Sequence, residues 1–344
     1  GEVLFGNCLM AGQGQAPARQ AAFKGGLPKE AGAVTLSKMC GSGMKAAMFA
    51  HDMLLAGTHD VMVAGGMESM TNAPYLLQKG RGGYRLGHDR IFDHMMLDGL
   101  EDAYEPGRSM GTFGEDCAAK YGFTRAEQDA FATASVERAK AATASGAFAA
   151  EITPVTVKSR AGETVVSVDE GPGKVKLDKI ASLKPAFKKD GTITAASSSS
   201  INDGAAALVM MRASTATKLG CKPLARIVGH ATHAQEPEWF ATAPLGATQK
   251  ALAKAGWAVG DVDLWEINEA FAVVPMALMK ELNLPHDKVN VNGGACALGH
   301  PIGASGARIM VTLIYALQAR GLKKGLATLC IGGGEATAVA VELV

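Results

Sequence analysis

Residues 290–308, NVNGGACALGHPIGASGAR, decide how this chain should fold, because their five glycines and one proline allow tight turns around a single histidine. Pro301 stands where a helix can begin, so we expect His300 at the N-terminus of a helix over residues 302–321. An apolar strand over residues 326–331 then carries Cys330 into a run of three glycines that starts at Gly332. His300 and Cys330 should therefore lie near one sheet edge, where open α/β sheets place their sites.

The first part of the chain has a similar order of features. A strand over residues 33–36 leads to Cys40, which is followed by Gly-Ser-Gly, a helix over 44–55, a strand over 60–64 and then Gly-Gly-Met-Glu at 65–68. The later stretch ends in Gly-Gly-Gly-Glu at 332–335. This order predicts an internal duplication, with two halves that face each other across one site.

Residues 69–200 break the pattern and are predicted to be an insertion, since they hold few strand signals apart from 152–157 and 163–168. Thr124 and Glu127 form a capping box for a helix to about residue 140. The serine tract 197–200 fits a linker or a ligand-lining turn. We therefore divide the chain into a first half (1–68 plus 201–222), an inserted loop domain (69–200) and a second half (223–344).

The composition and the net charge limit the classes of protein to which this chain can belong. The chain has 344 residues, 48% of them hydrophobic and 19% charged, with a net charge of +1. These values predict a large core, and they argue against nucleic acid as a partner, because proteins that bind phosphate backbones concentrate positive charge. We find no signal peptide and no run expected to cross a membrane.

The six cysteines do not resemble a disulfide framework in a chain of this length, so a reducing compartment, the cytosol, is expected.

The first residues of the chain lead to a further prediction. Residues 3–7 resemble the end of a strand more than the beginning of a domain. We expect further sequence upstream, without which a sheet edge of the first half would be uncovered.

The residue types alone leave more than one role open for Cys40, His300 and Cys330. Cys40 is expected where a strand becomes a helix, and free N–H groups and the helix dipole there would lower its pKa and favour a nucleophilic thiolate. It could equally be a small buried hydrophobe, while His300 could be a core histidine and Cys330 a strand residue. Cys296 and His300 are four apart, but glycine and proline disrupt a helical ligand pair, so no metal site is expected. The glycine-rich turns do not fit nucleotide-binding patterns.

Four motifs, in this order, resemble those of the thiolases, and specifically of the acetyl-CoA C-acetyltransferases. They are Cys40-Gly-Ser-Gly, Asn268-Glu-Ala-Phe, Gly299-His-Pro-Ile-Gly and Cys330-Ile-Gly-Gly-Gly. Further matches at residues 66–70, 185–187 and 202–204 extend the resemblance over nearly the whole chain. Any one motif is weak, but four in order are specific.

The resemblance implies a thiolase-like duplicated, layered αβαβα fold with an inserted loop domain, assembled as a homodimer or homotetramer. It also implies an acyltransferase that joins two acetyl-CoA molecules into acetoacetyl-CoA, or cleaves short 3-ketoacyl-CoA, through an acyl-cysteine. Cys40 would be the nucleophile, His300 its base and Cys330 the acid/base for the second substrate. Asn268, through a water, would form one oxyanion site with His300, and the N–H groups of Cys40 and Gly332 would form the other.

By the same resemblance, coenzyme A thioesters are substrates and no further cofactor is needed. The expected coenzyme A contacts are Met110, Phe187, Ala195, Ser199, Ala270 and Phe271. The chain departs from the family at Ser109, where many members have a histidine. It departs again at Phe240, where acetoacetyl-specific members have methionine, which leaves the acyl-chain length open.

Two other classes of protein fit these residues less well. A β-ketoacyl synthase shares the fold and the nucleophile, but its late catalytic residue would be histidine or asparagine rather than Cys330. A non-catalytic scaffold relative would be expected to have lost a reactive residue, and Cys40, His300 and Cys330 are all present.

Overall fold

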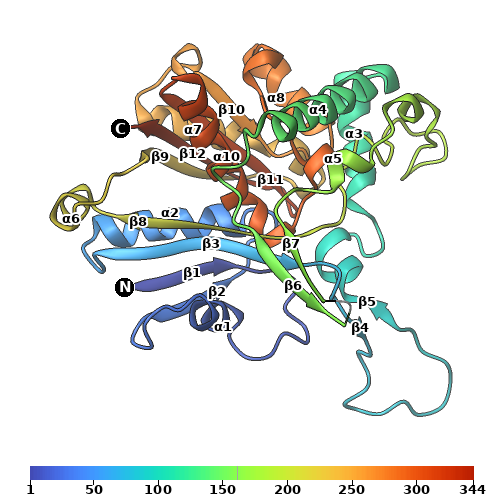
Figure 1. Cartoon of the computed structure of the whole chain (residues 1–344). Helices are drawn as coiled ribbons and strands as arrows, with labels where there is room; N and C mark the ends of the chain where they lie inside the picture. Colours follow the sequence, from blue (N-terminus) through green and yellow to red (C-terminus); the bar gives the residue numbers. More distant parts are fainter. Residues whose placement is uncertain (161) are drawn as a thin grey trace.

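The computed structural model describes residues 1–160 and 162–344, which contain two four-stranded sheets of related topology (Figure 1). In the first sheet, ordered β2-β1-β3-β8, β1 is parallel to β2 and β3, and β8 is antiparallel to β3. In the second sheet, ordered β10-β11-β12-β9, β10 is parallel to β11, and β12 is antiparallel to both neighbours. The strands are β1 (Glu2–Gly6), β2 (Gly32–Leu36), β3 (Val61–Ser69), β8 (Asp203–Met211), β9 (Ala225–Ala234), β10 (Leu264–Ile267), β11 (Lys324–Ile331) and β12 (Glu335–Leu343).

Helices complete a five-layered arrangement, which confirms the predicted αβαβα fold. Two apolar helices, α2 (Ser42–Leu55) and α10 (Ile302–Arg320), pack on each other between the sheets (Figure 1). The outer layers are α1 (Pro17–Lys24) against the first sheet and α7 (Ala243–Ala255) against the second. The order of layers is therefore helix, sheet, helices, sheet, helix.

The central helices are apolar on most sides because they face a sheet above and a sheet below. α10 has the length and hydropathy of a membrane span, a feature that the sequence reading missed, yet 72% of its most apolar window is buried inside the protein. Its start also comes very close to β3. A Cβ on Gly66 would lie 2.0 Å from the carbonyl oxygen of Gly303, so this crossing requires glycine.

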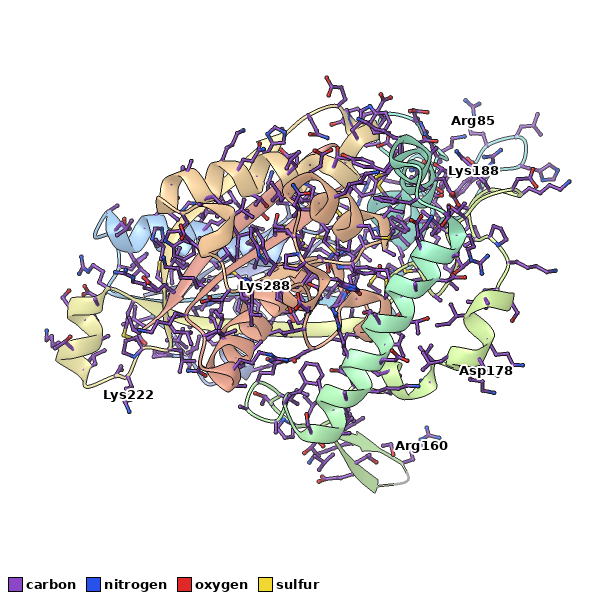
Figure 2. All side chains as sticks on the ribbon, turned by 90° about the horizontal axis from the view of Figure 1, so that it is seen from above. Arg85, Arg160, Asp178, Lys188, Lys222 and Lys288 are labelled. Atoms are coloured by element: carbon purple, nitrogen blue, oxygen red, sulfur yellow. The ribbon has the colours of Figure 1, made fainter. Side chains whose placement is uncertain are left out.

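The segment between β3 and β8 carries two helices that pack beside the second half. These are α3 (Met110–Tyr121) and α4 (Arg125–Ser145), and α4 begins with the predicted capping box at Thr124. The other elements are β4 (Tyr75–Leu76), β5 (Phe92–Asp93), β6 (Val155–Ser159), β7 (Gly162–Val166), α5 (Gly171–Lys174), α6 (Ala213–Leu219), α8 (Val273–Leu282) and α9 (Ala295–Leu298). Labelled charged side chains such as Arg160, Lys188 and Lys222 point outward from separate parts of the molecule (Figure 2).

One strand of the first sheet is longer than predicted. β3 continues to Ser69, so the Gly-Gly-Met-Glu stretch lies inside a strand rather than after it. Its pairing partner explains the difference, because small residues of β8 lie opposite, with Gly65 beside Ala207 and Glu68 beside Gly204.

Candidate active site

Cys40 lies at the join between β2 and α2, directly before the cap residue Gly41. The backbone N–H groups of Cys40 itself and of Gly332, which follows β11, interact with its sulfur and lower its pKa. The close approach of these loops depends on Gly41, because a Cβ there would lie 2.3 Å from Cδ1 of Ile331. The structure therefore brings the first and the last predicted motifs together, whereas the oxyanion role of these two N–H groups stays a prediction.

The predicted low pKa of Cys40 is wrong for the protein without substrate. Burial raises the pKa of this thiol to about 11 and outweighs the hydrogen bonds from Gly332 and from its own N–H, which lower it. Glu68 adds to the rise through its negative charge. Cys40 is thus a neutral thiol at pH 7 and needs a base to become a nucleophile.

His300 has the environment of such a base. Its side chain is buried, and Nδ1 makes a hydrogen bond with Oγ of Ser305. Because the Ser305 hydroxyl donates to the carbonyl oxygen of Pro301 (3.0 Å), it accepts the proton from Nδ1. This leaves Nε2 with the lone pair, and Nε2 has no hydrogen-bond partner among the described residues.

The charge state of His300 agrees with that arrangement. Burial, with a smaller effect from the positive charge of Arg308, lowers the pKa of the imidazole to about 4. The ring is therefore neutral at pH 7 and can take a proton.

Cys330 and Asn268 also lie in buried positions at the ends of strands of the second sheet. Cys330 is fully buried near the end of β11, and its pKa is raised well above 9 by burial and by the nearby Cys40. Asn268 follows β10, and both polar atoms of its amide are buried without a hydrogen-bond partner among the described residues. A buried amide with a free donor and a free acceptor fits the expected role of holding a water molecule.

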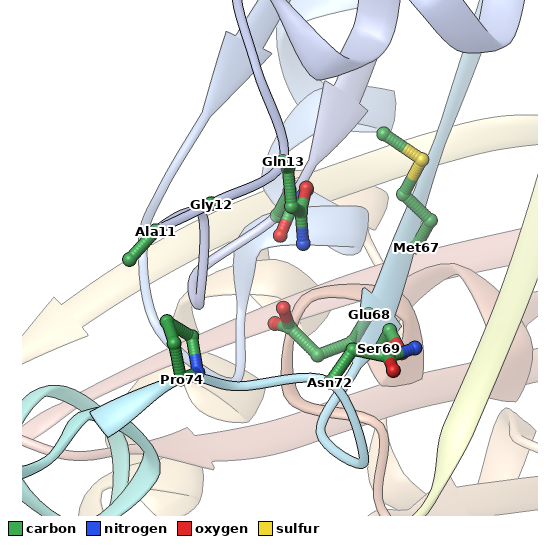
Figure 3. Close-up of a pocket in the computed structure, with 9 residues that line it drawn as sticks. Ala11, Gly12, Gln13, Met67, Glu68, Ser69, Asn72 and Pro74 are labelled. Atoms are coloured by element: carbon green, nitrogen blue, oxygen red, sulfur yellow. The ribbon is translucent and has the colours of Figure 1, made fainter.

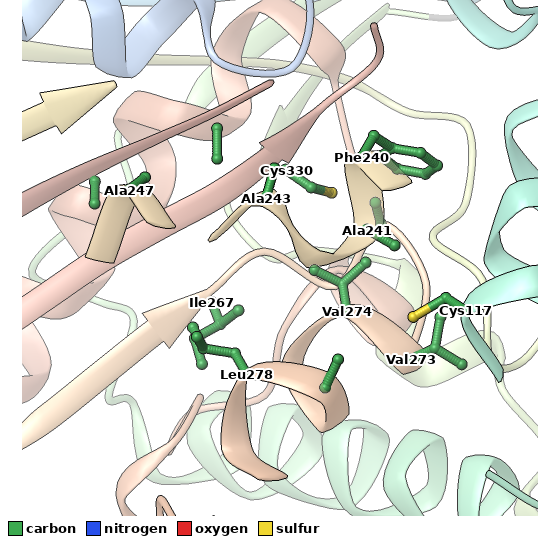
Figure 4. Packing of buried hydrophobic residues seen from close by; sticks show 14 of the residues in the cluster. Cys117, Phe240, Ala241, Ala243, Ala247, Ile267, Val273, Val274, Leu278 and Cys330 are labelled. Atoms are coloured by element: carbon green, nitrogen blue, oxygen red, sulfur yellow. The ribbon is translucent and has the colours of Figure 1, made fainter. Parts of the chain in front are cut away.

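The rings of Phe240 and Phe271 pack against each other as an aromatic wall with centroids 6.4 Å apart, and the centroid of Phe113 lies 6.4 Å from that of Phe240. Phe240 is only 3% exposed and belongs to the same apolar cluster as Cys330, and Figure 4 shows both side chains in that cluster. A change in the size of residue 240 is therefore expected to alter the packing around one of the two reactive sulfurs.

The expected coenzyme A contacts gather beside this wall. Phe187 packs edge-to-face on Phe271 (5.6 Å), and the Ser199 N–H donates to the carbonyl oxygen of Ala270 (3.0 Å). Met110 starts α3, with its sulfur 3.4 Å from where a Cβ of Gly332 would lie, and Ala195 is exposed.

The serine tract between the two halves is an ordered turn. The Thr194 N–H donates to Oγ of Ser197 (2.9 Å), and Oγ of Ser198 donates to the carbonyl oxygen of Thr194 (2.8 Å). Ser198 also pairs with Phe271 through an isolated bridge. This geometry argues against a free linker, and the ligand-lining role of the turn stays a prediction.

The sequence reading missed Glu68, Glu269 and Ser305. Glu68 is buried and accepts hydrogen bonds from three backbone N–H groups, including that of Gly303 (2.9 Å) at the start of α10. Glu269 is buried and accepts from Oγ of Ser135, Nδ2 of Asn290 and the N–H of Cys296. The signal available for Glu68 and Glu269 was their place inside recognised motifs, and Ser305 lies within the glycine-rich stretch 290–308. Their buried partners come from distant segments.

The alternative zinc pair does not converge. The sulfur of Cys296 faces the carbonyl oxygen of Glu269 (4.0 Å), whereas His300 faces Ser305.

A separate open cavity of about 550 Å³ lies beside Gln13, Glu68 and Asn72 (Figure 3). None of the predicted catalytic residues lines it.

Comparisons with known proteins agree with this geometry. The acetyl-CoA acetyltransferase of Chromobacterium violaceum is 52% identical over 99% of this chain and 87% of its own length. The acetyl-CoA acetyltransferase of Pseudomonas aeruginosa is 50% identical over 98% of this chain and 86% of its own.

Two solved structures are also similar to this chain over its whole length. The Bacillus anthracis acetyl-CoA acetyltransferase has a TM-score of 0.96 and 43% identity, over 100% of this chain and 87% of its own. The Acat5 thiolase of Ascaris suum, solved in complex with coenzyme A, has a TM-score of 0.93 and 41% identity over the same shares. Residues 1–214 match the N-terminal domain of thiolase and residues 221–343 the C-terminal domain. The chain belongs to the thiolase family.

Proposed function

We propose that this chain catalyses the reversible Claisen condensation of two acetyl-CoA molecules to acetoacetyl-CoA and free coenzyme A. The observation that supports this function most is the meeting of Cys40 and Gly332, which directs two backbone N–H groups at one reactive sulfur. Donors fixed in this way can stabilise the oxyanion that forms when a thioester is attacked. Relatives about 50% identical over nearly the whole chain are acetyl-CoA acetyltransferases.

In the first step, Nε2 of His300 takes the proton of the Cys40 thiol as the sulfur attacks the acetyl carbonyl carbon. The new S–C bond forms, the bond from that carbon to the sulfur of coenzyme A breaks, and the proton passes to the leaving thiolate. The high pKa of Cys40 and the low pKa of His300 mean that the proton moves during the attack and not before it.

In the second step, Cys330 exchanges a proton with the second acetyl-CoA. In the cleavage direction, its neutral thiol donates to the enolate of the departing acetyl-CoA, a role that the raised pKa of Cys330 suits. By microscopic reversibility, in condensation the neutral imidazole of His300 first takes the proton of Cys330, and the Cys330 thiolate then takes a methyl proton of the second acetyl-CoA. The resulting carbanion attacks the acetyl carbon on Cys40. The Cys40–carbon bond breaks, and the departing Cys40 thiolate takes the proton back from His300.

We propose that the acyl group is short, because Phe240 is a bulky, buried residue of the apolar cluster that contains Cys330. We propose that Met110, Phe187, Ala195, Ser199, Ala270 and Phe271 contact coenzyme A. Since the chain supplies the nucleophile, the base and the acid, we propose that no further cofactor takes part and that the thioesters are the partners.

We also propose that the chain consists of two thiolase halves with an inserted loop domain, divided at residues 68, 200 and 222.

We further propose that the enzyme works in the cytosol, in fatty acid metabolism, as a homodimer or homotetramer without nucleic-acid or membrane partners. Six free cysteines support a reducing compartment. Cell fractionation and light scattering of the purified protein test the location and the assembly.

The test of the function mixes the protein with acetoacetyl-CoA and coenzyme A and follows the loss of the enolate absorbance. We expect turnover and, with radioactive acetyl-CoA alone, a labelled protein, whereas Cys40→Ala should show neither. Loss of absorbance that persists in folded Cys40→Ala would contradict the mechanism. A folded wild-type protein without turnover or label would favour a scaffold relative.

A further inference from the structure

A second group of reactive side chains lies outside the active site and joins the two halves. It consists of His51 and Asp52 on α2 and His230 on β9. Nε2 of His230 is 2.9 Å from Oδ1 of Asp52, and Nδ1 of His51 is 3.4 Å from the same oxygen. Among residues 1–160 and 162–344, this is the one group of three His, Cys, Asp or Glu side chains whose ligand atoms lie within 4.8 Å of one another.

The distances in this group suit a transition-metal ion. Such an ion binds imidazole nitrogen and carboxylate oxygen at about 2.0–2.2 Å, so neighbouring ligand atoms are roughly 3–3.5 Å apart. The two separations from Asp52, 2.9 and 3.4 Å, agree with that range. Two imidazoles and one carboxylate are ligands preferred by zinc and its neighbours in the first transition row.

The surroundings allow an ion to enter and to keep water ligands. The side chain of Asp52 is 56% exposed and that of His51 22%, whereas His230 is 11% exposed and held more firmly. The two imidazole rings are arranged edge-to-face with centroids 5.0 Å apart, and their ligand nitrogens lie within 4.8 Å of each other. Solvent can therefore supply the remaining coordination positions.

The local charges act in both directions. The carboxylate of Asp52 lies within hydrogen-bond distance of both imidazoles and favours a cation. Lys45 and Lys254, which interact with this group, oppose one.

We propose that His51, Asp52 and His230 bind one divalent transition-metal ion, with Zn²⁺ as the reference, and that the ion fastens α2 to β9. Neutral His230 moves its proton from Nε2 to Nδ1 when Nε2 binds the ion. Nδ1 is buried without an acceptor among the described residues. Ligands that lack such a partner lose about 10–100-fold in affinity, so binding is micromolar and not nanomolar.

The proposed ion would act on the fold and not on the chemistry. His51 and Asp52 lie near the end of α2, and Cys40 lies directly before its start. An ion that joins α2 to β9 therefore resists separation of the two halves that together form the active site. Because only the folded chain brings the three ligands together, binding raises the melting temperature.

The test uses the purified full chain, freed of metal by a chelator and then titrated with Zn²⁺ in a calorimeter. We expect one ion per chain, a micromolar Kd and a melting temperature several degrees higher. His230→Gln and Asp52→Asn should each weaken binding at least tenfold and remove most of the thermal shift. His286→Gln is the matched control, since His286 is also partly buried but stacks on Phe131 outside the group.

Co²⁺ gives an independent readout, because its visible spectrum reports the ligands. We expect bands of nitrogen and oxygen coordination that disappear in His230→Gln. A sulfur-to-metal charge-transfer band would place the ion on a cysteine and overturn the proposal. Absence of saturable Zn²⁺ binding, or equal binding by folded wild type, His230→Gln and Asp52→Asn, would also overturn it.

Discussion

Replacement of Ser305 by alanine tests whether this hydroxyl selects the reactive tautomer of His300. Ser305 is fully buried in the first turn of α10, where it accepts from Nδ1 of His300 and donates to the carbonyl oxygen of Pro301. Without the hydroxyl, the proton on Nδ1 loses its acceptor in a buried site. Since Nε2 also lacks a partner among the described residues, the Nδ1–H tautomer is then no longer preferred, and rings that carry the proton on Nε2 have no base facing the substrate.

The size of the effect follows from the desolvation of one donor. A buried N–H group left without a partner costs about 1–3 kcal/mol, and about 1.4 kcal/mol corresponds to a factor of ten. We therefore expect Ser305→Ala to lower kcat roughly 10- to 100-fold. The variant should also be less stable, by a similar free energy of unfolding.

The assay compares acetyl labelling, turnover and melting with those of Thr312→Val. Thr312 is buried in the same helix and donates to Oε1 of Glu151 (3.0 Å), so its replacement removes a hydroxyl without touching His300. We expect Ser305→Ala to slow both labelling and turnover, whereas Thr312→Val should lose stability alone. If both variants lost activity equally, or if Ser305→Ala labelled within twofold of the wild-type rate, the reasoning would be refuted.

Further predictions concern the other buried groups. Cys330→Ala should still take up radioactive acetyl while turnover falls at least about 10²-fold; a folded variant that fails to label would contradict the roles. Phe240→Leu should raise kcat/KM for 3-ketohexanoyl-CoA relative to acetoacetyl-CoA about tenfold, and an unchanged ratio would place Phe240 away from the acyl chain. Burial raises the pKa of Glu266 to about 8, so its protonated form stabilises the folded state at low pH, and this stability is lost as the pH rises through about 8. Unfolding measured from pH 6 to 9 should show a loss of up to about 1.4 kcal/mol per pH unit that Glu266→Gln reduces; equal slopes would refute it.

Local signals explain why the surroundings of His300 could be predicted. Pro301 fixes the backbone before α10, and Gly321 ends the helix in the left-handed conformation, so both boundaries are set by neighbouring residues. The capping box at Thr124 is equally local. The extra length of β3 was not predictable in this way, because Gly65 and Gly66 disfavour a strand until β8 pairs with them.

Burial is the property that the sequence did not reveal. The start of α2 suggested a low pKa for Cys40, but Cys40 packs against an apolar cluster that contains Ile302 of α10, and burial raises its pKa instead. The sequence also did not show that His51 and Asp52 belong to a group of side chains. They are adjacent on a helical turn, and His230, about 180 residues later in the chain, reaches Asp52 only in the folded structure.

The two missed glutamates show how the halves depend on each other. Glu269 fixes groups of its own half and one serine of α4, whereas Glu68 in β3 accepts the N–H of Gly303 in the second half. A carboxylate at the N-terminus of α10 stabilises the helix through its free N–H groups and its dipole. Because His300 lies only three residues before Gly303, a side chain of the first half holds the loop that carries the base of the second. The duplicated halves are therefore interlocked near the active site, and neither half alone would hold the start of α10 in this way.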